Sequence, residues 1–211
     1  MAVRSFPSYP QRHSGTLVVL GSAPGGLDEF RRVKSSRSDL AVMTVNHAAG
    51  AVAADFLVSD HYEIIAELRE LQDALNHKYT THCTWDCNTA KWPEVDYWWE
   101  WPRSDASSAQ TAIRVGLAVG FDEVILCGCP LSSNRPLYLG TSGRGCVPIR
   151  ATWPPPRDIQ IHQSKESWNT SEEILERFRE NFARHAEAWK DRVFSMSGFT
   201  SEILGPPRFL K

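Results

Sequence analysis

The chain has 211 residues, of which 42% are hydrophobic and 23% charged, enough for one domain of ordinary size and too little for two. Its formal net charge of -2 gives no general attraction for nucleic acid or anionic membranes. No apolar run of about 18 residues occurs, and the first residues lack the apolar core of a secretion signal, so we expect a cytoplasmic protein without a membrane span. The five cysteines are then expected to be reduced and mostly buried.

The first half of the chain reads as strands and helices in alternation. Residues 1–14 contain two prolines and no hydrophobic periodicity, which predicts a flexible arm ahead of a single domain over 15–211. The domain opens with a β-branched and apolar run at 16–20, a glycine-rich turn and a short helix at 27–33. Further elements of the same kinds follow, namely strands at 40–46, 55–60 and 79–85 and an amphipathic helix at 61–77.

The second half contains the most unusual stretch of the composition. Five of the eight tryptophans lie between residues 85 and 101, and regular patterning disappears from 86 to 103, so we expect an insertion of loops over about 85–105. A long loop rich in Gly, Ser and Pro is expected over about 130–165, a length that is usually functional. The remaining elements are predicted from periodicity and capping signals: helices at 107–119 and 170–190, and strands at 124–129 and 193–196.

This order of elements predicts an α/β fold: a single Rossmann-like domain with a mostly parallel sheet and helices on both faces. Ligands of such sheets bind at the carboxyl ends of the strands. Polar residues follow three of the predicted strands, and we expect them to share one rim: Ser22, Asn46, Ser59 and Asp60.

The first turn, Gly21-Ser22-Ala23-Pro24-Gly25-Gly26, joins a strand to a helix, where backbone N–H groups can bind a phosphate. It lacks the G-x-G-x-x-G spacing of dinucleotide-binding proteins. Leu27-Asp28 stands where a P-loop has Lys-Ser/Thr. Phosphate contact and a simple tight turn therefore both remain open for this segment.

The cysteines do not predict a metal site. Cys83 and Cys87, next to His82, have the spacing C-x₃-C, and Cys127 and Cys129 have C-x-C, neither of which is a usual zinc-binding pair. The second pair lies on a predicted strand, and no local signature marks a nucleophilic cysteine. We expect neither a structural metal nor cysteine catalysis.

Residues 107–129 resemble the central motif of the bacterial sialyltransferases of glycosyltransferase family 42. Ser107-Ser108 opens the helix where the family has Ser-Gly, a Gly-aromatic turn closes it, and the next strand ends at Gly128. The resemblance extends to three other places: the first turn with Pro24, Asn46 at the end of the second strand, and His162-Gln163-Ser164-Lys165, which is similar to the family's His-Ser-Lys. Related motifs occur in the archaeal pterin pyrophosphokinases.

The resemblance implies a metal-independent glycosyltransferase that moves a sugar from a CMP-sugar-like donor to a hydroxyl acceptor, without a further cofactor. It implies that His162 is the general base. The donor contacts that it implies are Gly21, Ser22, Ala23, Pro24, Asn46, Ser107, Ser108 and Tyr138. Four positions depart from the family pattern and leave the donor's base and sugar open: Ser22, Ala23, Ala109 and Pro130. Asp105 stands at the position of the family's motif Arg.

Acceptor contacts are expected from the tryptophan-rich insertion, at Trp98, Trp99, Trp101 and Arg103, because indole faces stack on sugars and on nucleobases. A saccharide is favoured over a nucleic-acid base, since nearby acidic residues would repel phosphates. The alternative is that these tryptophans pack a lid onto the domain.

Two other functions remain open. One is transfer of a phosphate or pyrophosphate to a small heterocycle, which requires Mg²⁺ and carboxylates such as Asp55, Asp60 or Asp105. The other is a nucleotide-binding module without catalysis. The oligomeric state is not predicted.

Overall fold

In the computed structural model, the residues described are Tyr9, 12–23, 25–60, 64–84, 93–99, Trp101, 107–131 and 172–210. They form one seven-stranded, all-parallel sheet with the order β5-β4-β3-β2-β1-β6-β7. The strands are β1 (Thr16–Leu20), β2 (Leu40–Val45), β3 (Phe56–Ser59), β4 (Thr80–Thr84), β5 (Tyr97–Trp99), β6 (Glu123–Cys127) and β7 (Val193–Ser195). The predicted α/β class and single Rossmann-like domain are confirmed.

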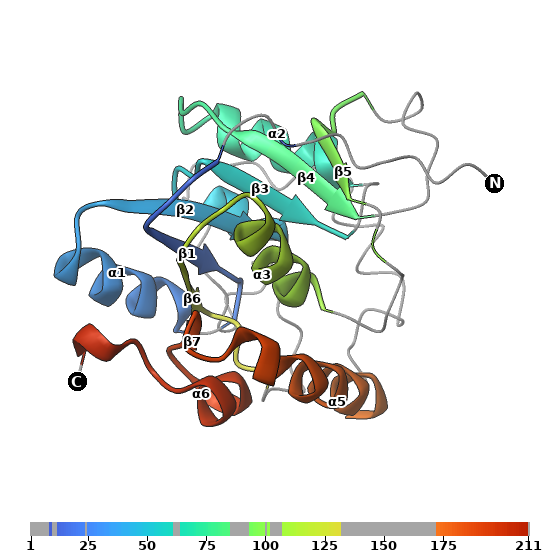
Figure 1. The fold of residues 1–211 in the computed structure, drawn as a ribbon. Coiled ribbons are helices and arrows are strands. Elements are labelled where there is room, and N and C mark those ends of the chain that lie inside the picture. The colour runs from blue at the N-terminus through green and yellow to red at the C-terminus, as the bar shows by residue number, and fades with distance from the viewer. Residues whose placement is uncertain are drawn as a thin grey trace.

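Helices cover both faces of the sheet (Figure 1). One face packs against α3 and α5, and the other against α1, α2 and the short 3-10 helix η1. Their bounds are α1 (Gly26–Ser36), η1 (Asn46–Gly50), α2 (Ile65–Asp73), α3 (Ser108–Ala118) and α5 (Glu172–Trp189), followed by α6 (Gly198–Leu204) and η5 (Arg208–Leu210) near the carboxyl terminus.

The strand order reverses at β1. From β1 the chain adds β2 to β5 on one side and then returns to place β6 and β7 on the other. Thr16 of β1 pairs with Leu40 of β2 and also with Glu123 of β6. In an open α/β sheet such a reversal marks the crevice where ligands bind, at the carboxyl ends of the central strands.

The central strand is buried on both faces, as its continuous apolar pattern predicts. All five residues of β1 are buried; Leu17 and Val19 face the layer of α3 and α5, whereas Val18 and Leu20 face α1. Gly116 lets α3 approach this strand closely, because a Cβ at that position would lie 2.6 Å from the Leu17 side chain.

The strand β5 corrects the expectation of loops from 86 to 103. It pairs in parallel with β4 at the edge of the sheet, and Asp96 just before it accepts hydrogen bonds from the Thr81 N–H (2.7 Å) and hydroxyl (2.8 Å). Three residues are too few to show a strand pattern in the sequence. The helix α6 was likewise not predicted.

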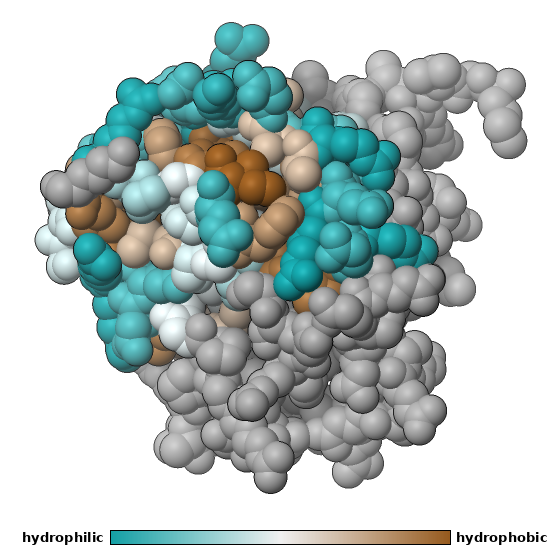
Figure 2. Space-filling view, turned by 90° about the horizontal axis from the view of Figure 1, so that it is seen from below, coloured by the Kyte–Doolittle hydropathy of each residue, from teal (hydrophilic) through white to brown (hydrophobic). Residues whose placement is uncertain are grey.

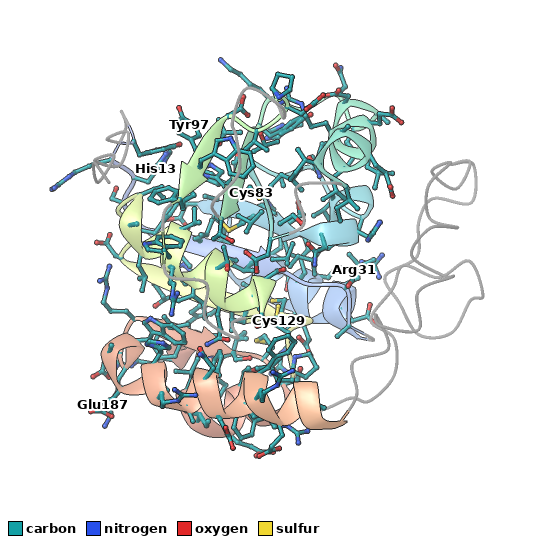
Figure 3. All side chains as sticks on the ribbon, turned by 90° about the vertical axis from the view of Figure 1, so that its right-hand side faces the viewer. His13, Arg31, Cys83, Tyr97, Cys129 and Glu187 are labelled. Carbon is teal, nitrogen blue, oxygen red and sulfur yellow. The ribbon has the colours of Figure 1, made fainter. Side chains whose placement is uncertain are left out.

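Two residues of the predicted flexible arm are packed on the domain. The His13 N–H donates to the Val119 carbonyl (2.9 Å), and its ring stacks on Phe121 with 5.0 Å between centroids. Tyr9 packs on Tyr97 of β5 at 4.8 Å, and Figure 3 shows His13 and Tyr97 on the same side of the molecule. Tyr9 and His13 thus contact the domain through their aromatic rings, a contact that the prediction of a flexible arm over residues 1–14 did not include.

Seen from below, the described surface is mostly hydrophilic where α5 faces outward (Figure 2). A small hydrophobic patch lies over α6, where Ile203 is 38% exposed. None of the helices in the described part of the chain is long and apolar enough to cross a membrane.

Candidate functional site

Asn46 stands at the centre of the polar groups on the carboxyl edge. It follows β2 in the left-handed region, with φ 52°, a conformation that Asn tolerates better than most residues. The Ser59 hydroxyl donates to Asn46 Oδ1 (2.8 Å), and Asn46 Nδ2 lies 3.5 Å from the Ser108 hydroxyl of α3. Because Ser59 occupies the amide oxygen, Asn46 presents its NH₂ group, a donor, toward the start of α3.

The start of α3 is fixed by its own cap and by α5. Ser107 is the N-cap, its backbone N–H donates to Gln110 Oε1 (3.1 Å), and Gln110 Nε2 donates to Asn181 Oδ1 of α5 (2.8 Å). The first turn of α3 has no acidic residue of its own, and the Asp60 carboxylate lies 3.1 Å from the Thr111 hydroxyl at the end of that turn. Ser107 thus has a structural role as the cap, whereas Ser108 lies beside Asn46.

Asp60 connects the ends of β3 and β4 to α3 at the same edge of the sheet. It follows β3 and accepts hydrogen bonds from the hydroxyls of Thr84 at the end of β4 (2.7 Å) and Thr111 of α3 (3.1 Å). Burial lowers the pKa of the Arg114 guanidinium, and the nearby Asp60 carboxylate partly offsets this shift. Of the four residues expected to share a rim, Asn46 and Ser59 bond to each other and Asp60 bonds to Thr84 and Thr111 at the same edge, whereas Ser22 lies in the turn after β1 and is not linked to them by these bonds.

The first turn packs directly against the segment after β6. The Gly21 N–H donates to the Cys127 carbonyl (2.8 Å), and the Ala23 N–H donates to the Gly128 carbonyl (3.2 Å). A Cβ on Gly128, which has φ +65°, would lie 2.6 Å from the Gly21 carbonyl oxygen. Gly21 and Ala23 thus lie at the carboxyl end of β1 as predicted, but their amides are already bonded within the fold.

The described cysteines are free and buried, in agreement with the prediction of reduced thiols: Cys83, Cys127 and Cys129. Burial raises the pKa of Cys129 to about 12 and raises the pKa of Cys127 as well, with a smaller contribution from Glu29. Neither group is a thiolate near neutral pH, so neither is an activated nucleophile.

Among the residues that the structure describes, no group of three His, Cys, Asp or Glu side chains is placed to hold a metal ion. Two of the carboxylates considered for Mg²⁺ also lie at opposite ends of β3. Asp60 follows this strand, whereas Asp55 precedes it and pairs with His77 (3.2 Å) and the Val42 N–H (2.8 Å). Asp55 and Asp60 therefore do not share a site.

The three described tryptophans of the insertion, Trp98, Trp99 and Trp101, do not form one surface. Trp98 packs on the α2 side of the sheet, whereas Trp99 packs on the α3 side and is 8% exposed. Trp101 stacks on Trp99 with 5.0 Å between centroids and an interplanar angle of 20°. Adjacent strand residues point to opposite faces, so Trp98 is not brought together with Trp99 and Trp101 as an acceptor platform would require.

His82 anchors this stack from inside the fold. The Trp99 indole N–H donates to His82 Nδ1 (3.0 Å), which places the His82 proton on Nε2, where it is donated to the Thr80 hydroxyl (2.9 Å). Burial lowers the pKa of His82 to about 3. His82 is therefore a neutral core residue whose two ring nitrogens are hydrogen-bonded to Trp99 and Thr80.

This burial makes the fold sensitive to acid. The unfolded chain protonates His82 below about pH 6.5, whereas the folded chain does not until about pH 3, so the unfolded state binds more protons in between. Stability contributed by neutral His82 is fully present above pH 6.5 and falls by up to about 1.4 kcal/mol per pH unit below it. Urea unfolding of the wild type and His82→Gln between pH 7 and 5 measures this. If the free energy of unfolding changes with pH equally in the wild type and in His82→Gln, the contribution of His82 to acid sensitivity is contradicted.

Four of the predicted site residues lie outside the described residues: Pro24, Arg103, Tyr138 and His162. Of the others, the structure brings Asn46 and Ser108 together with Ser59, which the strand-end pattern had singled out. Thr84 could have been found by the same pattern, since it ends β4. Nothing in the sequence marks Thr111, because its hydrogen bond to Asp60 depends on where α3 packs against the sheet.

Comparisons with protein-family models, curated proteins and solved structures find no match for this chain.

Proposed function

We propose that the carboxyl edge of this sheet binds a nucleotide, and that the protein is a metal-independent glycosyltransferase with a CMP-sugar-like donor. The observation that carries this proposal is the Asn46 amide, which Ser59 holds with its NH₂ group toward Ser108 at the first turn of α3. Asn46 and Ser108 are two of the residues that the resemblance to glycosyltransferase family 42 assigns to the donor. Binding at the edge next to the β1 reversal is also what the topology favours.

The chemistry of this edge suits an anionic, acceptor-rich ligand. Asn46 Nδ2, the Ser108 hydroxyl and the first turn of α3 supply hydrogen-bond donors and a positive dipole. A nucleoside monophosphate carries acceptors on its base, ribose and phosphate. Donors held in place by a network need little reorganisation when such a ligand binds.

In the proposed reaction, His162 removes the proton from the acceptor hydroxyl. The acceptor oxygen then bonds to the anomeric carbon as the bond from that carbon to the phosphate oxygen breaks. The phosphate oxygen takes the electron pair and leaves as the nucleoside monophosphate, whose charge the donors at the edge stabilise. We propose a saccharide as acceptor, with Trp101 and Arg103 as its contacts, and a cytoplasmic location.

A thermal-shift screen of nucleotides and nucleotide sugars, with and without Mg²⁺, tests the proposal because a ligand of the native state raises the melting temperature. Stabilisation by cytidine nucleotides or CMP-sugars without Mg²⁺ would support it. A requirement for a purine triphosphate with Mg²⁺ would instead favour phosphate or pyrophosphate transfer. Binding without turnover of any sugar donor would favour a binding module.

Asn46→Ala is expected to weaken cytidine nucleotide binding at least about tenfold, because it removes the oriented donor and the partner of Ser59. Isothermal titration calorimetry measures the affinity. Asn76→Ala is a matched control, because Asn76 also has φ 52° and the two substitutions strain the backbone alike. Asn76 follows the carboxyl end of α2, away from the proposed site. Equal affinities for the two variants would count against Asn46 as a ligand contact.

A further inference from the structure

Glu29 reaches from the first turn of α1 into the crevice where the strand order reverses. Its Oε2 accepts a hydrogen bond from the Gly128 N–H (2.8 Å), across 99 residues of sequence. Gly128 follows β6 directly, beside the first turn of the chain. The carboxylate therefore occupies a backbone donor at the point where doubly wound proteins bind phosphates.

Three other amides of this crevice also donate to carbonyls within the fold. The N–H groups of Gly21, Ala23 and Gly26 donate to the carbonyls of Cys127, Gly128 and Ala23, respectively, at 2.8, 3.2 and 3.0 Å. Close contact of the two segments leaves no room at Gly26, where a Cβ would lie 2.7 Å from Gly128 Cα. A phosphate chain entering here would have to displace Glu29 to reach the Gly128 N–H.

The two helix starts at the carboxyl edge differ in the acidic residues that they carry themselves. The first turn of α1 carries Asp28 and Glu29, whereas the first turn of α3 carries none and has the Asp60 carboxylate 3.1 Å from its Thr111 hydroxyl. Asp28 points outward to Arg31 (3.0 Å) and its side chain is 82% exposed; Figure 3 shows Arg31 on the outer side of α1. Glu29 is the one of the pair whose carboxylate is directed at the crevice.

We propose that Glu29 determines ligand specificity by excluding nucleoside di- and triphosphates from the crevice while one phosphate is accepted near α3. This inference rests on the proposed nucleotide function. Additional phosphates would extend toward a carboxylate that already accepts the Gly128 N–H, and like charges repel in a partly buried site. A monophosphate ester, which is the leaving group of a CMP-sugar, avoids this repulsion.

Calorimetric titration of CMP, CDP and CTP without Mg²⁺ tests the inference on the full chain. Wild-type protein is expected to bind CMP at least about tenfold more tightly than CTP. Glu29→Gln, which keeps the size and the hydrogen-bond acceptor, is expected to raise CTP affinity about tenfold and to change CMP affinity less than about twofold. Glu29→Met also frees the Gly128 N–H and should raise CTP affinity further. Asp28→Asn removes the same charge on the outer side and should leave both affinities unchanged.

Equal wild-type affinity for CMP and CTP, or equal effects of Glu29→Gln and Asp28→Asn, would overturn the role of Glu29. Thermal shifts with inorganic pyrophosphate separate this outcome from failure of the proposed function. If no cytidine nucleotide binds any variant, but pyrophosphate stabilises Glu29→Gln or Glu29→Met and not the wild type, Glu29 keeps its role and the proposed function fails. If pyrophosphate affects none of them, or all of them alike, the inference itself fails.

Discussion

Gly128→Ala is expected to lower the free energy of unfolding by at least about 3 kcal/mol. Two effects add at this position. The residue has φ +65°, a region costly for any side chain, and a Cβ would lie 2.6 Å from the Gly21 carbonyl oxygen and 2.9 Å from Gly26 Cα. Both neighbours are backbone, so neither can rotate away, and relief requires the first turn and β6 to separate. Chemical denaturation measures the loss.

Gly25→Ala isolates the part of this effect that comes from close packing. Gly25 has φ +83°, but nothing lies within 4 Å of its hypothetical Cβ. Its substitution should therefore cost only the conformational strain, about 1 kcal/mol. If Gly128→Ala is no more destabilising than Gly25→Ala, the contact between the turn and β6 is looser than described.

His162→Ala is expected to reduce glycosyl transfer by a factor of about 10² to 10⁴, the range for loss of a general base. Affinity for the nucleotide should stay within about twofold, because the proposed role of His162 concerns the acceptor proton alone. Initial rates with a donor found in the thermal-shift screen, together with calorimetric binding of CMP, measure the two quantities separately. Unchanged turnover would eliminate His162 as the base.

His77→Ala provides the control for this substitution. The His77 side chain is 42% exposed and pairs with Asp55, which precedes β3 and so lies at the amino edge, opposite the proposed site. Its loss should leave both turnover and CMP affinity unchanged. A comparable loss of activity in this variant would indicate a general effect of histidine removal rather than base catalysis.

Strand positions could be predicted because a strand that is buried on both faces has a recognisable local run of apolar and β-branched residues. Residues 16–20 and 40–45 are runs of β-branched and apolar residues, and such runs are typical of strands covered on both faces. A polar residue at the end of a predicted strand falls at the carboxyl edge, and this rule grouped Ser22, Asn46, Ser59 and Asp60, of which Asn46 and Ser59 are bonded to each other.

Contacts between distant elements could not be predicted in the same way. The Glu29 to Gly128 bond joins residues 99 positions apart, and nothing local to either residue distinguishes it from an exposed Glu or a turn Gly. Tyr9 and Trp99 show the same limit. Each sits in a segment without periodicity, and each is placed by aromatic partners, Tyr97 and His82 respectively, that only the folded sheet brings near.

The position of β1 has a consequence for synthesis of the chain. Thr16 and its partner Glu123 are 107 residues apart, so one side of β1 lacks its neighbour until more than half of the protein has left the ribosome. An apolar strand edge exposed for that time is prone to pair with other chains. The strand β1 is therefore open to incorrect pairing on that side until β6 has been made.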